Sequence, residues 1–183
     1  NENHKADYLK FNSKILRTDY ITKDEITIND SINVYVPYVN INNYIFETFG
    51  EFVYKHSSSI LIDTIIQNAE ATKSSEVYIN INRSTIELLV VDKTQLLLFN
   101  VFEYNSKEDF IYYVLFVFEQ LKLNVETTLI KLSGYIDKGD ETYSFLYTYV
   151  RHIDFISTNY NFEISNTMES KNLHHYYLIL NSF

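Results

Sequence analysis

The chain has 183 residues, of which 46% are hydrophobic and 21% charged, a composition typical of one or two globular domains rather than of a disordered chain. Lys and Arg total 15 against 24 Asp and Glu, and the resulting charge of -9 argues against nucleic-acid binding because it repels phosphates. The absence of cysteine excludes disulfides, thiolate nucleophiles and cysteine-ligated metal sites.

The first part of the chain combines helical spacing with short runs of strand-forming residues. Its expected elements are, in order, a helix over residues 5–15, a polar connector over 22–31, a strand over 33–38, a helix over 41–49, a strand over 51–56 and a helix from 57 to about 71. Pro37 has no N–H to donate, so we expect it at the end of the strand or on an edge strand. Gly50 is expected to end the second helix, and Ser57 to Ser59 to cap the third.

A polar segment, residues 70–75 (EATKSS), predicts a linker and divides the chain into domains 1–72 and 73–183. The second domain is expected to contain strands over 77–81, 85–91 and 95–101, a helix over 107–123, a strand over 128–132, a helix over 140–151 and a strand over 153–156. Two short polar turns, Asn82-Arg83 and Asp92-Lys93, make the first three strands an antiparallel meander. Residues 173–180 are too few and too uniformly apolar for the sequence to decide whether they form a helix or a strand.

The helix over 107–123 has two further features. Ser106 and Asp109 predict a capping box at its start. Its side chains are apolar nearly all round, so we expect that other elements besides its own sheet pack on it.

The apolar stretch of this helix, residues 110–118, is far shorter than the roughly 20 residues that span a bilayer. No signal peptide is evident either, so we expect a cytoplasmic protein without a membrane partner. The chain begins with Asn, which predicts a fragment or a processed form.

The predicted order β-β-β-α-β-α-β is that of the ribonuclease-H-like unit, which predicts an α/β fold with a mixed five-stranded sheet. Several strings, listed here, resemble an uncharacterised Bacteroidetes family called domain of unknown function 3822: ADYLKFN, VYVPYVNINN, YKHSS and FEYNSKEDFIYYVLFVFEQL. The resemblance implies an actin-like ATPase fold and no established activity. It also implies that the first domain is only the later part of a first unit.

An actin-like fold directs attention to the turn after the first strand of the meander, where such ATPases carry an Asp for Mg²⁺ and a Gly against phosphate. The corresponding segment is Asn80, Asn82, Arg83 and Ser84, without a carboxylate or a glycine. An amide is a poor substitute for a carboxylate on a hard cation. The strand end at Ser133 and Gly134 matches the adenosine side of such a site. We expect a degenerate phosphate hairpin, no catalytic residue, no metal and no cofactor.

Other polar residues have structural interpretations. Glu87, Asp92 and Glu103 are expected on a solvated face or in a turn, which argues against a nuclease with a carboxylate cluster. His174 and His175 are adjacent, so we expect them to face different directions and to make a poor metal pair. His56 and His152 are expected to make structural contacts, His56 by bonding the backbone at a strand end.

Six tyrosines cannot all be buried with satisfied hydroxyl groups, and a tyrosine-rich surface is typical of protein interfaces. They are Tyr104, Tyr112, Tyr113, Tyr143, Tyr147 and Tyr149.

The first hypothesis for the function is therefore a non-hydrolysing interaction or scaffold module that binds a protein partner. The alternative is an ATP-binding protein or phosphotransferase whose N-terminal strands supply the missing acids, with ATP and Mg²⁺ as ligands.

Overall fold

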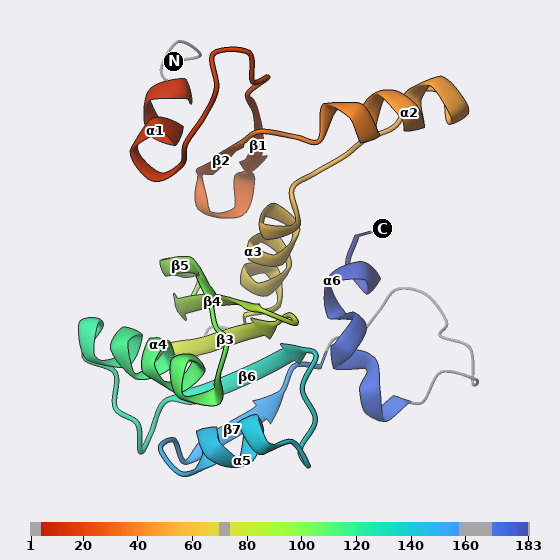
Figure 1. Cartoon of the computed structure of the whole chain (residues 1–183). Helices are drawn as coiled ribbons and strands as arrows, with labels where there is room; N and C mark the ends of the chain where they lie inside the picture. The colour runs from red at the N-terminus through yellow and green to blue at the C-terminus, as the bar shows by residue number, and fades with distance from the viewer. Residues whose placement is uncertain (1–4, 70–73, 158–169, 183) are drawn as a thin grey trace. The chain divides into compact units, whose positions relative to one another are not determined.

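The computed structural model describes residues 5–69, 74–157 and 170–182, and the chain forms two compact units, residues 1–63 and 64–183. The division between the units falls within helix α3 (Ser57–Asn68). The domain boundary expected from the sequence, between residues 72 and 73, lies outside the described residues. Each unit is described separately below, with the labels of Figure 1.

The first unit contains a two-stranded antiparallel sheet and short helices. Its elements are α1 (Lys5–Asn12), β1 (Thr22–Ile26), the 3₁₀ helix η2 (Thr27–Asn29), β2 (Ser31–Tyr35), α2 (Val39–Phe49) and the beginning of α3. β1 pairs with β2, and Asp30 adopts a left-handed conformation with φ 53° in the connection between them. The helix predicted over residues 41–49 is confirmed, and Gly50, with φ 86°, donates its N–H to Phe46 at its end.

Three expectations about this unit are wrong. Residues 22–31 are not a connector, because they contain β1, whose charged sequence TKDEI lacks the apolar alternation that marks a strand. Residues 51–56 have no regular structure and pair with no strand, although the rings of Phe52 and Tyr54 lie near each other, with centroids 5.8 Å apart. The strand expected over residues 33–38 is present as β2, but its expected end is wrong: β2 ends at Tyr35, before Pro37, which has no N–H to donate.

The start of α3 also differs from the prediction. The N–H of Ser58 donates to Nδ1 of His56 at 3.1 Å, so the histidine and not a serine accepts a bond from the first turn. Asp24 on β1 accepts hydrogen bonds from the His56 N–H at 2.7 Å and from the Ser59 hydroxyl at 2.6 Å. These bonds attach the start of α3 to the sheet of the first unit. α3 ends at Asn68, before the expected residue 71.

The second unit contains the predicted β-β-β-α-β-α-β order, which is confirmed. Its elements are β3 (Glu76–Ile81), β4 (Thr85–Asp92), β5 (Gln95–Glu103), α4 (Lys107–Gln120), β6 (Leu129–Gly134), α5 (Glu141–Tyr147), β7 (His152–Phe155), the 3₁₀ helix η3 (Ser170–Tyr176) and α6 (Tyr177–Leu180). The sheet order is β5-β4-β3-β6-β7. β3, β4 and β5 are antiparallel, whereas β6 is parallel to both β3 and β7, so the predicted mixed five-stranded sheet is confirmed. Helix α5 is shorter than expected.

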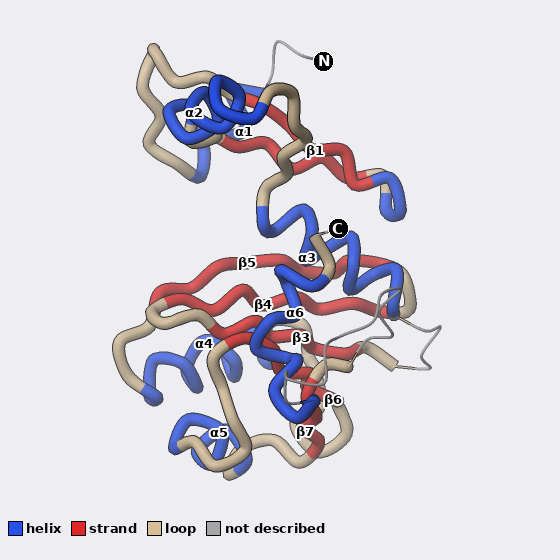
Figure 2. The backbone as a smooth tube through the Cα atoms, turned by 90° about the vertical axis from the view of Figure 1, so that its right-hand side faces the viewer, coloured by secondary structure: helices blue, strands red, loops and turns tan. Residues whose placement is uncertain are grey.

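The core of this unit lies between the sheet and α4, which shares one face of the sheet with α5 (Figures 1 and 2). Phe110, Val114 and Val117 of α4 are fully buried there. α5 contacts α4, as expected of a second covering element, but Tyr112 remains 63% exposed, so the helix is not covered all round. The Ser106–Asp109 capping box is confirmed.

The opposite face of the sheet carries a second layer. η3 and α6 both contact β6. Tyr78, which alternates with the core residues of β3, points to this face and lines a cavity of about 250 Å³ together with Ile65 and Tyr177. Among the described residues, the longest helix, α4, has 14 residues, and none is long and apolar enough to cross a membrane.

Candidate functional site

Sheet topology determines which of the predicted site residues meet. β3 is paired with β4 on one side and with β6 on the other, which places Asn80 opposite Glu87 and also opposite Ser133. The three residues therefore form a row across three strands. Side chains of directly opposed residues on one face of a sheet lie within contact distance, so this row brings together two predicted residues and one that was expected elsewhere.

The row is a chain of hydrogen bonds with one direction. The Ser133 hydroxyl donates to Oδ1 of Asn80 at 3.0 Å, and Nδ2 of Asn80 donates to Oε2 of Glu87 at 2.7 Å. A carboxylate only accepts hydrogen bonds, so the bond to Glu87 determines the orientation of the Asn80 amide. All three side chains are buried. The oxygen and the nitrogen of the Asn80 amide therefore both have hydrogen-bond partners within the protein.

The burial of Glu87 corrects the expectation that it lies on a solvated face. Only 6% of its surface is exposed. The expectation was wrong because β4 is buried on both faces. Ile86 and Leu88 belong to the core below α4, and Glu87, between them in sequence, lies on the other face. A strand buried on both sides loses the polar-out pattern that would identify its solvent face.

The turn itself is held by Tyr104. Its hydroxyl donates to the carbonyl oxygen of Asn82 at 2.9 Å, and its N–H donates to the carbonyl oxygen of Ser84 at 3.0 Å. Across the turn, the Asn82 N–H donates to the carbonyl oxygen of Thr85 at 2.8 Å. The side chains of Arg83 and Ser84 are exposed, unlike the buried Asn80. The six predicted residues are therefore not gathered into one site.

Gly134 has a clear packing role. Its φ is 83°, and a Cβ built on it would lie 2.1 Å from the carbonyl oxygen of Ile81. The same carbonyl accepts the Tyr135 N–H at 2.7 Å. Only glycine allows β6 to leave the sheet so close to the end of β3. A role for Gly134 beside a nucleotide base stays a prediction.

A second polar cluster, on the same face, was missed from the sequence. Glu76 accepts the Tyr78 hydroxyl at 2.6 Å and pairs with Nζ of Lys131 at 2.9 Å. Burial, and then the hydrogen bond to Glu76, raise the pKa of Tyr78 far above its usual value. Lys131 is brought to this cluster by the parallel pairing of β3 with β6, a tertiary relation that no local pattern shows.

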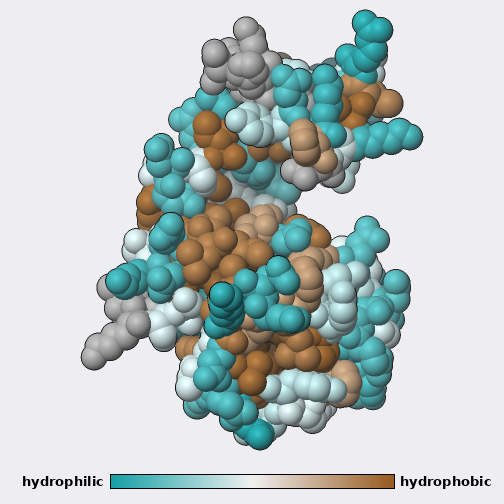
Figure 3. All heavy atoms as spheres, turned by 90° about the vertical axis from the view of Figure 1, so that its left-hand side faces the viewer, coloured by the Kyte–Doolittle hydropathy of each residue, from teal (hydrophilic) through white to brown (hydrophobic). Residues whose placement is uncertain are grey.

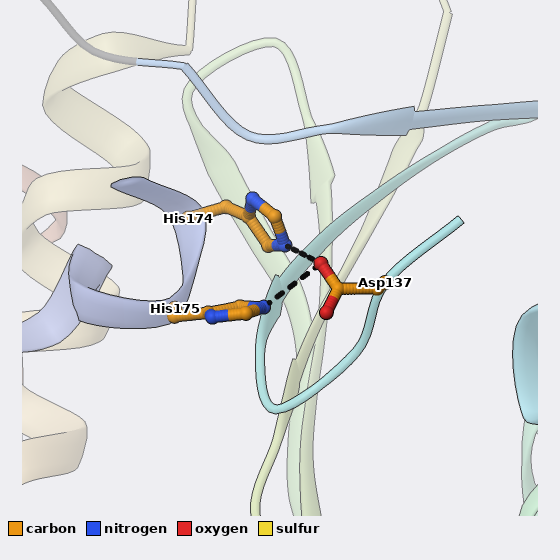
Figure 4. Close-up of side chains that lie close together, drawn as sticks. All are labelled: Asp137, His174 and His175. Atoms are coloured by element: carbon orange, nitrogen blue, oxygen red, sulfur yellow. Dashed lines mark hydrogen bonds and ion pairs between the residues drawn. The ribbon is translucent and has the colours of Figure 1, made fainter. Parts of the chain in front are cut away.

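The histidine pair also differs from the prediction. Nε2 of His174 and Nε2 of His175 lie 3.8 and 3.1 Å from the same oxygen of Asp137, in the loop after β6 (Figure 4). Successive residues of a 3₁₀ helix differ by about a third of a turn in direction, and two imidazole rings are long enough to converge from there. His56 does bond the backbone, as expected.

Large hydrophobic side chains are exposed in both units. α2 has no buried residue, and its exposed apolar side chains, with those that flank it, form what we call the α2 surface: Tyr38, Ile41, Tyr44, Phe46, Phe49 and Val53. In the second unit, hydrophobic side chains reach the surface on the side of α4 and β5 (Figure 3). Of the six tyrosines considered above, Tyr112, Tyr147 and Tyr149 are exposed, so the prediction that some remain unburied is confirmed.

Comparison with known proteins agrees with this architecture. The structure is similar to the crystal structure of a Bacteroides thetaiotaomicron VPI-5482 protein with an actin-like ATPase fold and unknown function, with a TM-score of 0.77 and 20% sequence identity. The match covers 85% of this chain but only 61% of that protein. No curated protein matches the chain. The fold is thus that of the actin-like ATPases, and the family model described as "Protein of unknown function (DUF3822)" matches residues 1–153. The chain belongs to this family.

Proposed function

We propose that this protein is a non-hydrolysing member of the actin-like fold that binds another protein, and that the α2 surface takes part in the contact. The observation that carries the proposal is the exposure of α2. Ile41, Tyr44 and Phe49 are 55%, 67% and 77% exposed, and the helix contains one charged residue, Glu47. Large apolar side chains exposed on one helix and its flanks are typical of an interaction site.

The composition of the α2 surface is that of a binding surface. Tyr and Phe are enriched at the centre of protein interfaces, whereas Lys, Glu and Asp are depleted there. The surface also includes a hollow, which Phe46 and Val53 line together with Tyr54. A hollow beside exposed rings gives a partner both a place for an anchoring side chain and apolar area to cover.

The chemistry of the β3–β4 hairpin supports the non-hydrolysing part of the proposal. The turn offers a phosphate no glycine backbone, and the Asn82 N–H, a donor that a phosphate would need, is bonded to the carbonyl oxygen of Thr85. Asn80, at the position of the expected acid, directs its amide to Glu87 and Ser133. A binding role in a cytoplasmic assembly is consistent with both observations.

A photo-crosslinking experiment in the native cells tests the binding role. A photoreactive phenylalanine analogue replaces Tyr44 in the full-length protein, and the matched control carries it at Tyr8, an equally exposed aromatic residue (73%) on α1. We expect one discrete crosslinked protein from position 44 that Phe49→Ser abolishes, and none from position 8. Equal labelling from both positions would contradict the proposal.

One observation favours the alternative, an ATP-binding protein. Position 80 has no carboxylate, but Glu87 on the neighbouring strand places one 2.7 Å from the Asn80 amide nitrogen. If Glu87 serves Mg²⁺, Glu87→Gln abolishes Mg²⁺-dependent ATP binding by the full-length protein, while Asp92→Asn, at the other end of β4, leaves it unchanged. If the wild type binds no ATP in the presence of Mg²⁺, the alternative fails, and if Glu87→Gln binds ATP as well as the wild type does, Glu87 does not serve the metal.

A further inference from the structure

Three potential metal ligands from two distant segments converge at the loop after β6. Asp137 comes from the connection between β6 and α5, whereas His174 and His175 come from η3. Their ligand atoms all lie within 4.8 Å of one another. The closest pair is His175 Nε2 and Asp137 Oδ1 at 3.1 Å, and the pair formed by His174 Nε2 and the same oxygen is separated by 3.8 Å.

These separations are close to those that a metal ion needs. Bonds of about 2.0 to 2.2 Å to nitrogen and oxygen in a tetrahedral Zn²⁺ site place the ligand atoms about 3.3 to 3.6 Å apart. The distance from His175 is slightly shorter than this value and the distance from His174 slightly longer, while all three ligand atoms lie within 4.8 Å of one another. The three side chains are therefore placed to converge on one ion after adjustment of their rotamers.

We propose that Asp137, His174 and His175 bind one Zn²⁺ ion. Two neutral imidazoles and one carboxylate are the ligands that Zn²⁺ accepts, whereas Ca²⁺ and Mg²⁺ prefer oxygen alone. Three protein ligands leave the fourth position of a tetrahedral site to water or to a group from outside the chain. The side chain of Asp137 is 52% exposed, so the cluster is accessible from solvent on the side of its acidic member.

The surroundings hold the ligands in place. The ring of His174 is buried and packs on Phe155 of β7, with ring centroids 4.3 Å apart. The N–H of Asp137 donates to a carboxylate oxygen of Asp140 at 2.8 Å, which fixes the loop that carries the acidic ligand. Ligands already ordered in the absence of an ion lose little conformational entropy when it binds.

One hydrogen bond competes with the metal. Nε2 of His174 lies 2.7 Å from the carbonyl oxygen of Ile136. Since a carbonyl only accepts, this nitrogen carries the proton when the bond is formed, and the imidazole must change to the tautomer with its proton on Nδ1 to bind an ion through Nε2. A purely hydrogen-bonded cluster is therefore the interpretation that the experiment must exclude.

The consequence of occupation is a link between distant parts of the second unit. An ion at this place joins η3 to the β6–α5 loop through ligands that are at least 37 residues apart in sequence, Asp137 and the two histidines. A ligand that binds only the folded state stabilises it in proportion to the logarithm of its concentration relative to its dissociation constant. Zn²⁺ is thus expected to raise the unfolding temperature of the protein, and the open fourth position gives a partner a point of attachment.

Titration calorimetry of the metal-free, tag-free full-length protein with Zn²⁺ tests the proposal. We expect a site of one ion per chain that is weakened at least about tenfold by His175→Ala and by Asp137→Asn. His152→Ala is the matched control, because His152 is an exposed histidine of the same unit and lies outside the cluster. Far-ultraviolet circular dichroism and thermal unfolding without metal establish that each variant is folded.

A second readout uses Co²⁺ in place of Zn²⁺. Intense visible absorption, typical of a four-coordinate Co²⁺ ion, is expected from the wild type and from His152→Ala, and not from His175→Gln, which retains a polar side chain of similar length. No saturable Zn²⁺ binding by the wild type, or binding that the cluster variants retain in full, would overturn the proposal. Equal weakening by His152→Ala would overturn it as well.

Discussion

The Asn80 side-chain amide donates a 2.7 Å hydrogen bond to the buried carboxylate of Glu87 on the neighbouring strand. This bond explains why an amide is suited to position 80. An aspartate there would face Glu87 across the same short distance, and two buried carboxylates at that separation cannot both be ionised without strong repulsion.

Asn80→Asp therefore restores the acid that an ATPase would need and destabilises the protein. We expect a loss of about 2 kcal/mol in the free energy of unfolding at neutral pH, from repulsion and from the lost donor. The loss should diminish toward acidic pH, where one carboxyl group is protonated. Urea unfolding at several pH values measures it, with Asn100→Asp on the exposed side of β5 as control. Equal stability of the two variants at pH 7 would contradict this account.

Gly134→Ala is expected to disturb the junction of β3 and β6. Its Cβ would lie 2.1 Å from the carbonyl oxygen of Ile81, and the φ of 83° is unfavourable for alanine, so we expect a loss of at least about 2 kcal/mol. A Cβ on Gly139 meets nothing within 4 Å, which makes Gly139→Ala the matched control. Comparison of the two urea midpoints is the measurement. A midpoint for Gly134→Ala equal to that of the control would show that the close approach is relieved at little cost.

The capping box of α4 has a measurable pH signature. Hydrogen bonds from the Asn105 N–H and from Ser106 lower the pKa of Asp109, so its ionised form is favoured in the folded protein. The stabilisation is complete above the pKa of the unfolded chain and is lost as the pH falls through the lower folded value. Ser106→Ala should cost about 1 kcal/mol.

Thermal unfolding between pH 2 and 7 tests the role of Asp109. Asp109→Asn should be less stable than the wild type at pH 7 and should approach it at low pH. Glu108→Gln, in the same turn but outside the capping box, controls for the helix dipole. A difference between Asp109→Asn and the wild type that does not change with pH would contradict the assignment.

Tyr78 is expected to couple stability to alkaline pH. Its folded pKa is raised, first by burial and then by the bond to Glu76, so the fold favours the protonated hydroxyl. This stabilisation is present below the unfolded value of about 10 and is lost as the pH rises above it. Tyr78→Phe should therefore lose less stability than the wild type between pH 9 and 11. The exposed Tyr112→Phe is the control, and parallel curves for wild type and Tyr78→Phe would refute the coupling.

Local sequence patterns were sufficient for the order of strands and helices from β3 to β7 in the second unit. The three meander strands are long, apolar and joined by turns too short for anything but antiparallel pairing, and the capping box marks the start of α4. β1 was missed because its TKDEI sequence is stabilised by pairing with β2 and by the contacts of Asp24, not by an apolar pattern of its own.

The candidate site was less accessible to sequence reasoning for a physical reason. The burial of Glu87 and the meeting of Asn80 with Ser133 depend on the strand order β4-β3-β6 and on its register. The convergence of His174 and His175 on Asp137 depends on the position of η3 against β6. Residue type and spacing identified these side chains, but only tertiary pairing decides which of them meet.

Titration calorimetry of the full-length protein with ATP and Mg²⁺ tests the central claim most directly. The account predicts no saturable heat at micromolar concentrations and no ATP hydrolysis above that of buffer, because Asn80 is bound to Glu87 and Ser133 and the turn is held by Tyr104. Binding of one ATP per chain with micromolar affinity, dependent on Mg²⁺ and abolished by Glu87→Gln, would contradict it.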